Sequence, residues 1–122
     1  MPRLMSVSLT EPQVRARRKT VTRRDGWWED KNGKRMLKPG DRLTLVRKAM
    51  GLRKGEHVER ITDVEVISVR RERLDAITQA EVIAEGFPGK NPVWFTAFFC
   101  GSHKGCTPET IVTRIEWRYL DA

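Results

Sequence analysis

The sequence contains no apolar run near the roughly 20 residues that a membrane-spanning helix requires. It also begins without the apolar segment and small-residue cleavage site of a secretory signal. Cysteine is scarce, with only Cys100 and Cys106, which argues against a secreted domain held together by disulfides. We therefore expect a cytoplasmic protein that has no membrane partner and keeps both thiols reduced.

Acidic residues are fewer than basic ones: 16 Asp and Glu stand against 24 Lys and Arg, for a net charge of +8. Such an excess favours polyanions, above all the phosphates of nucleic acid, although a merely soluble basic surface has the same composition. The chain has 122 residues, enough for one domain over residues 1–122 that buries about two thirds of its unfolded surface. A core of that size needs no metal, cofactor or disulfide.

Hydrophobic periodicity and turn residues predict a strand-rich chain. Strands are predicted at residues 4–9, 19–24, 41–48, 57–74 and 110–120, short helices at 11–18, 79–86 and 92–100, and a loop at 25–40. Thr78, with Glu81 as a capping box, and Asn91, followed by a proline, mark the starts of the second and third helices. The apolar spacing slips between Ile61 and Val64, which predicts a bulge or bend. The fold class is therefore α+β: a small, partly open and mostly antiparallel β-barrel with two or three short helices.

The third predicted helix and the loop after it contain a group of aromatic residues followed by two cysteines and a histidine. Four aromatic residues recur at helical spacing and are predicted to pack in the core rather than bind a ligand: Trp94, Phe95, Phe98 and Phe99. Cys100, His103 and Cys106 follow with a spacing that suits three zinc ligands, or a Cys–His nucleophile whose thiol pKa Lys104 lowers. Because no second ligand pair or orienting group is evident, we favour two incidental thiols and predict no metal.

The segment from residue 15 to 24 holds six basic residues: Arg15, Arg17, Arg18, Lys19, Arg23 and Arg24. Like charges disfavour a protonated lysine, so a partly desolvated Lys19 can serve as a general base for the hydroxyl of Thr22. Glu85 is the candidate carboxylate to orient the lysine. In one continuous strand Lys19 and Thr22 would face opposite sides, so they converge only if the chain kinks. Otherwise Lys19 is one more phosphate-facing cation and Thr22 a packing residue.

Four segments in order resemble the ASCH domain family, small β-barrels related to the PUA domain. They are RKTVTRR at 18–24, LKPGDRLTL at 37–45, AEGF at 84–87 and VTRIEW at 112–117. The resemblance runs from about residue 4 to 119 and implies a PUA-like barrel with a cleft for RNA or a nucleoside-like ligand. It also implies the amide hydrolysis of N4-acetylcytidine found in small bacterial members, with the catalytic motif falling on Lys19, Thr22 and Glu85 and a following arginine on Arg24. Some other members of the family are reported as ribonucleases, and many have no established activity.

Some features depart from those amidohydrolases, among them Arg17 in place of a glycine and the long loop with Trp27 and Trp28. An aromatic, basic rim suits base stacking and phosphate contacts.

Two hypotheses follow: a hydrolase of a modified pyrimidine nucleoside or of RNA, or a non-catalytic RNA reader. In the reader, phosphates would contact Arg15, Arg17, Arg18, Arg23 and Arg24. Trp27 and Trp28 would stack on bases, or else form a hydrophobic lid over the barrel end.

Overall fold

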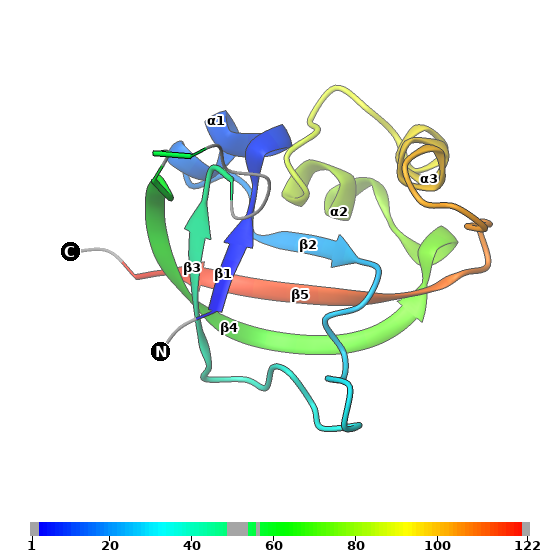
Figure 1. Cartoon of the computed structure of the whole chain (residues 1–122). Coiled ribbons are helices and arrows are strands. Elements are labelled where there is room, and N and C mark those ends of the chain that lie inside the picture. Colours follow the sequence, from blue (N-terminus) through cyan, green and yellow to red (C-terminus); the bar gives the residue numbers. More distant parts are fainter. Residues whose placement is uncertain (1–2, 49–53, 56, 121–122) are drawn as a thin grey trace.

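The computed structural model describes residues 3–48, 54–55 and 57–120. Its centre is a five-stranded sheet, in the order β1-β3-β4-β5-β2, that curls into a half-barrel (Figure 1). β1 pairs with β3 in parallel, and the other neighbours are antiparallel. The strands are β1 (Arg3–Ser6), β2 (Val21–Arg24), β3 (Arg42–Val46), β4 (Arg60–Arg73) and β5 (Ile111–Tyr119).

Three short α-helices lie along one side of the curled sheet (Figure 1). They are α1 (Glu11–Arg15), α2 (Gln79–Ala84) and α3 (Pro92–Gly101), with 3-10 turns η1 (Ser8–Thr10) and η2 (Leu74–Ala76). The side chains of Thr78 and Asn91 cap α2 and α3 as predicted, each accepting a backbone N–H bond. The α+β, partly open barrel expected from the sequence is therefore confirmed. No helix of the described residues is long and apolar enough to cross a membrane.

Two details of the local structure differ from the sequence prediction. The first predicted helix, 11–18, ends at Arg15 because the chain turns into the left-handed region at Arg17, with φ of 59°. The first predicted strand ends at Ser6, before η1. The predicted irregularity in β4 is present: the pairing with β3 passes from Thr62 to Arg60 and leaves Ile61 as an extra residue.

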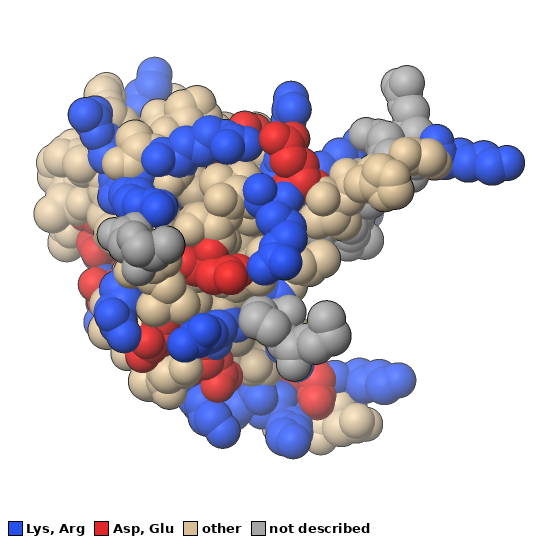
Figure 2. All heavy atoms as spheres, turned by 90° about the vertical axis from the view of Figure 1, so that its left-hand side faces the viewer, with Lys and Arg blue, Asp and Glu red and all other residues tan. Residues whose placement is uncertain are grey.

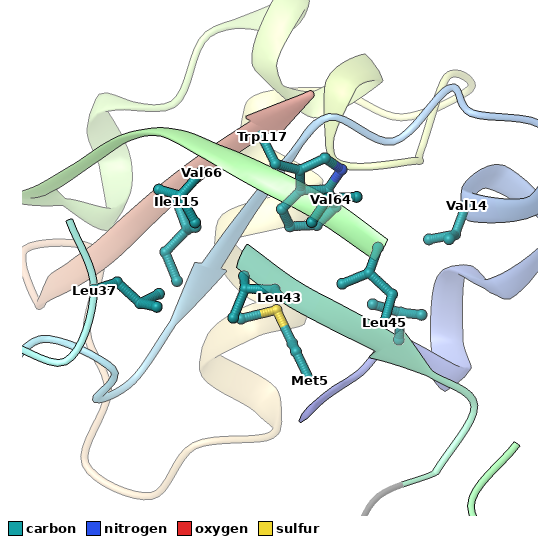
Figure 3. Packing of buried hydrophobic residues seen from close by; sticks show 10 residues of the cluster. Met5, Val14, Leu37, Leu43, Leu45, Val64, Val66, Ile115 and Trp117 are labelled. Atoms are coloured by element: carbon teal, nitrogen blue, oxygen red, sulfur yellow. The ribbon is translucent and has the colours of Figure 1, made fainter. Parts of the chain in front are cut away.

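Two hydrophobic clusters stabilise the fold. The first fills the half-barrel and brings Met5, Leu43 and Leu45 against Ile115 and Trp117 (Figure 3). The second lies under α2 and α3 and contains Leu74, Ile77, Val82, Phe95, Phe99 and Val112. The predicted core role of the third helix thus holds for Phe95 and Phe99.

The sheet is open between its two edge strands, β1 and β2. The side chain of Arg24, at the end of β2, reaches across this opening and donates from Nη2 to the carbonyl oxygen of Ser6 at 2.8 Å. We call this opening the seam. Because no further strand pairs with β2 at the seam, side chains from other elements can lie beside it.

Candidate functional site

A cavity of about 240 Å³ lies at the seam, and we call it the seam pocket. Its walls come from the turn after β1, from β2 and Lys19 two residues before it, from the end of α2, and from α3 with the loop that follows. Five residues that the sequence predicted to be catalytic or to bind nucleic acid line it: Lys19, Thr22, Arg23, Arg24 and Glu85. The catalytic candidates, up to 66 residues apart in the sequence, therefore share one cavity.

Lys19 lies just before β2 rather than inside it. The left-handed turn at Arg17 folds the chain back so that the amide of Lys19 donates to the carbonyl of Gln13. The carbonyl of Lys19 then accepts from the indole Nε1 of Trp117 at 3.1 Å. This kink removes the alternation that would have placed Lys19 and Thr22 on opposite faces of a strand.

Glu85 faces Lys19 from the end of α2. Lys19 Nζ donates to the backbone carbonyl of Glu85 at 2.6 Å and to its carboxylate Oε1 at 3.1 Å. Both side chains are only 4% exposed. Gly86 ends the helix with φ of 107°, and a Cβ there would lie 3.0 Å from Thr10 Cγ2, so only glycine lets α2 come this close. The tight turn fixes the carboxylate against the lysine.

Burial is the main influence on the pKa of Lys19. Desolvation lowers the pKa of Lys19, the carboxylate of Glu85 opposes that shift, and the positive charges of Arg24 and Arg23 add to it. The sequence argument expected a lowered pKa from neighbouring arginines, whereas the main cause is removal from water. Lys19 is therefore closer to neutral than an exposed lysine, as a general base requires.

Arg24 brings a positive charge to Thr22. Its Nε donates to Thr22 Oγ1 at 3.2 Å, while Nη2 holds Ser6. Burial lowers the pKa of Arg24, and the Glu85 carboxylate opposes this; a guanidinium nevertheless stays protonated in proteins. Thr22 thus accepts a hydrogen bond and keeps its own proton to donate. The same guanidinium can stabilise negative charge that forms at an attacked carbonyl.

Arg23 lies in the interior instead of on the surface. Its side chain is 1% exposed and contacts three carboxylates: Nη2 donates to Glu72 at 2.8 Å and Glu81 at 3.0 Å, and Nη1 donates to Glu85 at 3.3 Å. Arg114 joins the group through Glu81. We call these side chains the carboxylate cluster. Arg23 therefore belongs with the groups that hold Glu85, and we do not include it in the exposed basic surface.

Glu81 makes the carboxylate cluster sensitive to acid. Hydrogen bonds from Arg114 and then from Arg23 outweigh partial burial and lower the pKa of Glu81 from 4.5 to about 2. A carboxylate whose pKa falls on folding stabilises the protein above its unfolded pKa and loses that effect as the pH drops to the folded value.

We expect the free energy of unfolding to decline between pH 4.5 and 2, as Glu81 is protonated. Glu81→Gln is expected to be less stable at neutral pH and to show a shallower decline, measured by urea unfolding across this range. Parallel pH curves for the two proteins would contradict this assignment.

The other predicted phosphate contacts are exposed. Arg15 pairs with Glu11 and Glu59, and the guanidinium of Arg17 lies 5.2 Å from the ring centre of Tyr119. Arg18 is exposed beside them. Figure 2 shows Lys and Arg side chains spread over one side of the molecule with acidic side chains between them. These three arginines lie outside the lining of the seam pocket, so the basic surface and the pocket are separate features.

The two tryptophans also lie outside that lining. Trp27, with φ of 64°, packs against the first hydrophobic cluster. Trp28 is half-buried, and the guanidinium of Arg35 covers its ring at 3.3 Å from the centre. Of the two sequence-based alternatives, the packing of Trp27 matches the hydrophobic lid. For base stacking by Trp28, Arg35 would first have to leave the ring.

The aromatic wall of the seam pocket comes from residues that the sequence analysis did not assign to the site. Phe87 follows Gly86, and Phe98 is 36% exposed on α3. His103 stacks on Phe99 with ring centres 4.1 Å apart, and its Nδ1 is 2.8 Å from the carbonyl oxygen of Phe99. No sequence signal separates Phe98 from the buried Phe95 and Phe99, because only the packing of α3 distinguishes them.

The Cys–His loop does not form the metal arrangement that its spacing allows. The sulfurs of Cys100 and Cys106 are 2.7 Å apart, but His103 turns to Phe99. Within residues 3–48, 54–55 and 57–120, no three His, Cys, Asp or Glu side chains are grouped to hold a metal ion. Desolvation and the contact with Cys106 raise the pKa of Cys100 to about 11. That is the opposite of the activation by Lys104 that a nucleophilic thiol would need.

The sequence matches no family model and, at a significant level, no curated protein. The fold does match solved structures. A crystal structure of a protein from Enterococcus faecalis V583, described with the family model DUF984, has a TM-score of 0.67 at 13% identity, and the match covers 99% of this chain and 81% of that one. A crystal structure of an ASCH domain from Lactobacillus crispatus JV V101 has a TM-score of 0.64 at 13% identity, with coverages of 91% and 70%.

Proposed function

We propose that this chain, which has the fold of an ASCH domain, hydrolyses the acyl amide of a modified pyrimidine nucleoside such as N4-acetylcytidine. The observation that carries the proposal is the meeting of Lys19, Thr22 and Glu85 in one buried pocket. A base, a hydroxyl and a carboxylate are the groups that acyl transfer needs, and perturbed, buried titratable groups in a cavity mark functional sites.

The size and walls of the seam pocket support a single small ligand. A cavity of about 240 Å³ lies just below the usual range of ligand pockets and suits one base with its substituent better than a folded RNA. Phe87 and Phe98 offer flat apolar surface on one side, against which a pyrimidine ring can stack. Lys19 and Arg24 lie in the same cavity, where they can meet the polar edge and the acyl group.

The first step is a proton transfer. Neutral Lys19 takes a proton from the hydroxyl of Thr22, or from a water beside it, and the oxygen so activated attacks the acyl carbon. A bound water or the substrate connects the lysine and the threonine. Glu85 keeps the amine oriented through the bond from Lys19 Nζ to Oε1.

The second step breaks the amide bond. Negative charge moves onto the carbonyl oxygen, where the Arg24 guanidinium stabilises it. The Lys19 ammonium returns its proton to the leaving nitrogen, so the products are cytidine and, after water has released the acyl group, acetate. Every proton that Lys19 accepts is given back, which leaves the site ready for another substrate.

A second function, non-catalytic RNA binding, is favoured by a different observation: the exposed Arg15, Arg17 and Arg18 and the basic face in Figure 2. In that reader the arginines contact phosphates, and the seam pocket receives one unstacked base. The two functions make different demands on Lys19, since a reader needs its hydrogen bonds and a hydrolase needs its proton transfer.

The test compares free nucleosides with RNA. We expect the protein to convert N4-acetylcytidine to cytidine and to leave N4-methylcytidine, which has no acyl carbon, intact. Liquid chromatography measures both reactions. Labelled RNA oligonucleotides with and without one acetylated cytidine report binding at several salt concentrations. Binding without conversion of either substrate would favour the reader and contradict the hydrolase. RNA affinity without a steep salt dependence would contradict the phosphate contacts.

A further inference from the structure

The loop from Cys100 to Cys106 is closed by its own backbone and by its two sulfurs. The amide of His103 donates to the carbonyl of Cys100 at 3.3 Å, and the amide of Cys106 donates to that of His103 at 3.2 Å. Gly105 takes a left-handed φ of 76° to complete the turn. The chain thereby holds the Sγ atoms of Cys100 and Cys106 in contact, 2.7 Å apart. We call this segment the cysteine loop.

The cysteine loop faces two different surfaces. Cys100 and Cys106 line an apolar groove on α3, together with Val93, Ala97 and Pro108. Both cysteines are half-buried there, so small molecules can reach them. His103, between them in the sequence, lines the seam pocket. A chemical change at the sulfurs therefore acts on a segment that forms part of the pocket wall.

We propose that Cys100 and Cys106 are a redox modification site, at which a reversible intramolecular disulfide fixes His103 in the wall of the seam pocket. The modification itself is independent of the proposed function; only its effect on substrate rests on that function. Cytosolic proteins carry such disulfides mainly when these are transient and sense redox state, which agrees with two free thiols held in contact.

The oxidant is a small-molecule disulfide such as oxidised glutathione. The thiolate of one cysteine attacks it, forms a mixed disulfide and releases one small thiolate. The thiolate of the second cysteine then attacks the sulfur of the first, which forms the protein disulfide and releases the second small thiolate. The protein gives up two electrons and two protons, and the small disulfide takes up both. A small dithiol in excess reverses each step.

The disulfide acts by removing freedom from the cysteine loop. A covalent link across a short loop reduces the conformations that the chain can sample. His103 then keeps its stacking on Phe99 and its place in the pocket wall. In the reduced protein only the hydrogen bonds and ring contacts hold His103 there. The position of this part of the pocket wall is therefore more firmly fixed in the oxidised state than in the reduced state.

The sequence provides a direct assay, because Lys104 lies between the two cysteines. Trypsin cleavage after Lys104 separates the reduced protein into peptides 91–104 and 105–114, whereas a Cys100–Cys106 disulfide keeps them joined. We expect treatment with oxidised glutathione to yield the joined peptides from a monomer that has lost two hydrogen atoms by intact mass. Cys100→Ser and Cys106→Ser are the matched controls, and each is expected to stop at a mixed disulfide with glutathione.

A second measurement tests the link to the pocket. The ring signals of His103 in NMR spectra, which sense the stacked ring of Phe99, are expected to shift on oxidation and return on reduction. Mixed disulfides on both cysteines of the wild type, without the joined peptides, would overturn the modification site. Joined peptides with unmoved His103 signals would overturn the coupling. If the joined peptides form but no nucleoside is converted in either redox state, the modification site stands and the proposed function fails.

Discussion

Replacement of Lys19 by methionine is expected to lower kcat/KM for N4-acetylcytidine by roughly 10²–10⁴-fold, the usual contribution of a general base. Methionine has a similar length and suits a buried position, so the loss should reflect the missing amine and not a collapsed pocket. Lys38→Met, at an exposed position of the loop before β3, is the matched control and should retain full activity. The assay is the rate of cytidine release, with circular dichroism to show that both variants are folded. Undiminished turnover by Lys19→Met would remove Lys19 from the mechanism.

Glu85→Gln sharpens this test because it changes a charge and preserves the shape. The carboxylate raises the pKa of Lys19 against the effect of burial, so its removal lets that pKa fall further. If neutral Lys19 is the base, the rising limb of the rate against pH should move to lower pH in Glu85→Gln, while the maximal rate falls because the amine is less firmly oriented. A limb that stays in place, or moves to higher pH, would show that another group titrates in the reaction.

The architecture followed from the sequence because it depends on local patterns. Alternating apolar residues marked most strands. The slip after Ile61 located one of two irregularities in the pairing of β4, and the other, at Ile67, was not predicted. Thr78 and Asn91 marked helix starts because a capping side chain acts within three residues. The resemblance of ordered segments then predicted an ASCH fold. Strand order did not follow, because pairing between β1 and β3 depends on contacts that no local pattern encodes.

The sequence predicted the catalytic candidates of the site but not the surroundings of Arg23 and Phe98, which depend on contacts between distant segments. Lys19, Thr22 and Glu85 were candidates from their side-chain chemistry and again from the resemblance, and all three line the seam pocket. Arg23 looked like one more surface cation, because its carboxylate partners lie 49 to 62 residues away in the sequence. Phe98 looked like core because α3 is apolar on most of its surface, and only the packing of the helix shows which aromatic ring is left for the pocket.

Arg23→Met is expected to cost about 3–5 kcal/mol in the free energy of unfolding, the usual effect of removing one partner from a buried ion pair. Methionine fills much of the same volume but removes the guanidinium that Glu72, Glu81 and Glu85 share, so each carboxylate keeps one neighbouring cation fewer. Arg18→Met, at an exposed position of the same basic segment, is the matched control and should change stability by no more than about 0.5 kcal/mol. Urea unfolding at neutral pH measures both.

A further substitution separates the charge of Arg23 from its geometry. Arg23→Lys keeps the positive charge but replaces a planar fork of donors by a single ammonium, which cannot reach three carboxylates at once. We therefore expect Arg23→Lys to lie between wild type and Arg23→Met in stability. In the wild-type protein, the Nε atom of Arg23 is buried without a hydrogen-bond partner in the described structure. Burying this atom costs folding free energy, which the bonds from Arg23 to the carboxylates must outweigh. Equal stability of Arg23→Met and Arg18→Met would show that the carboxylate cluster contributes nothing to the fold.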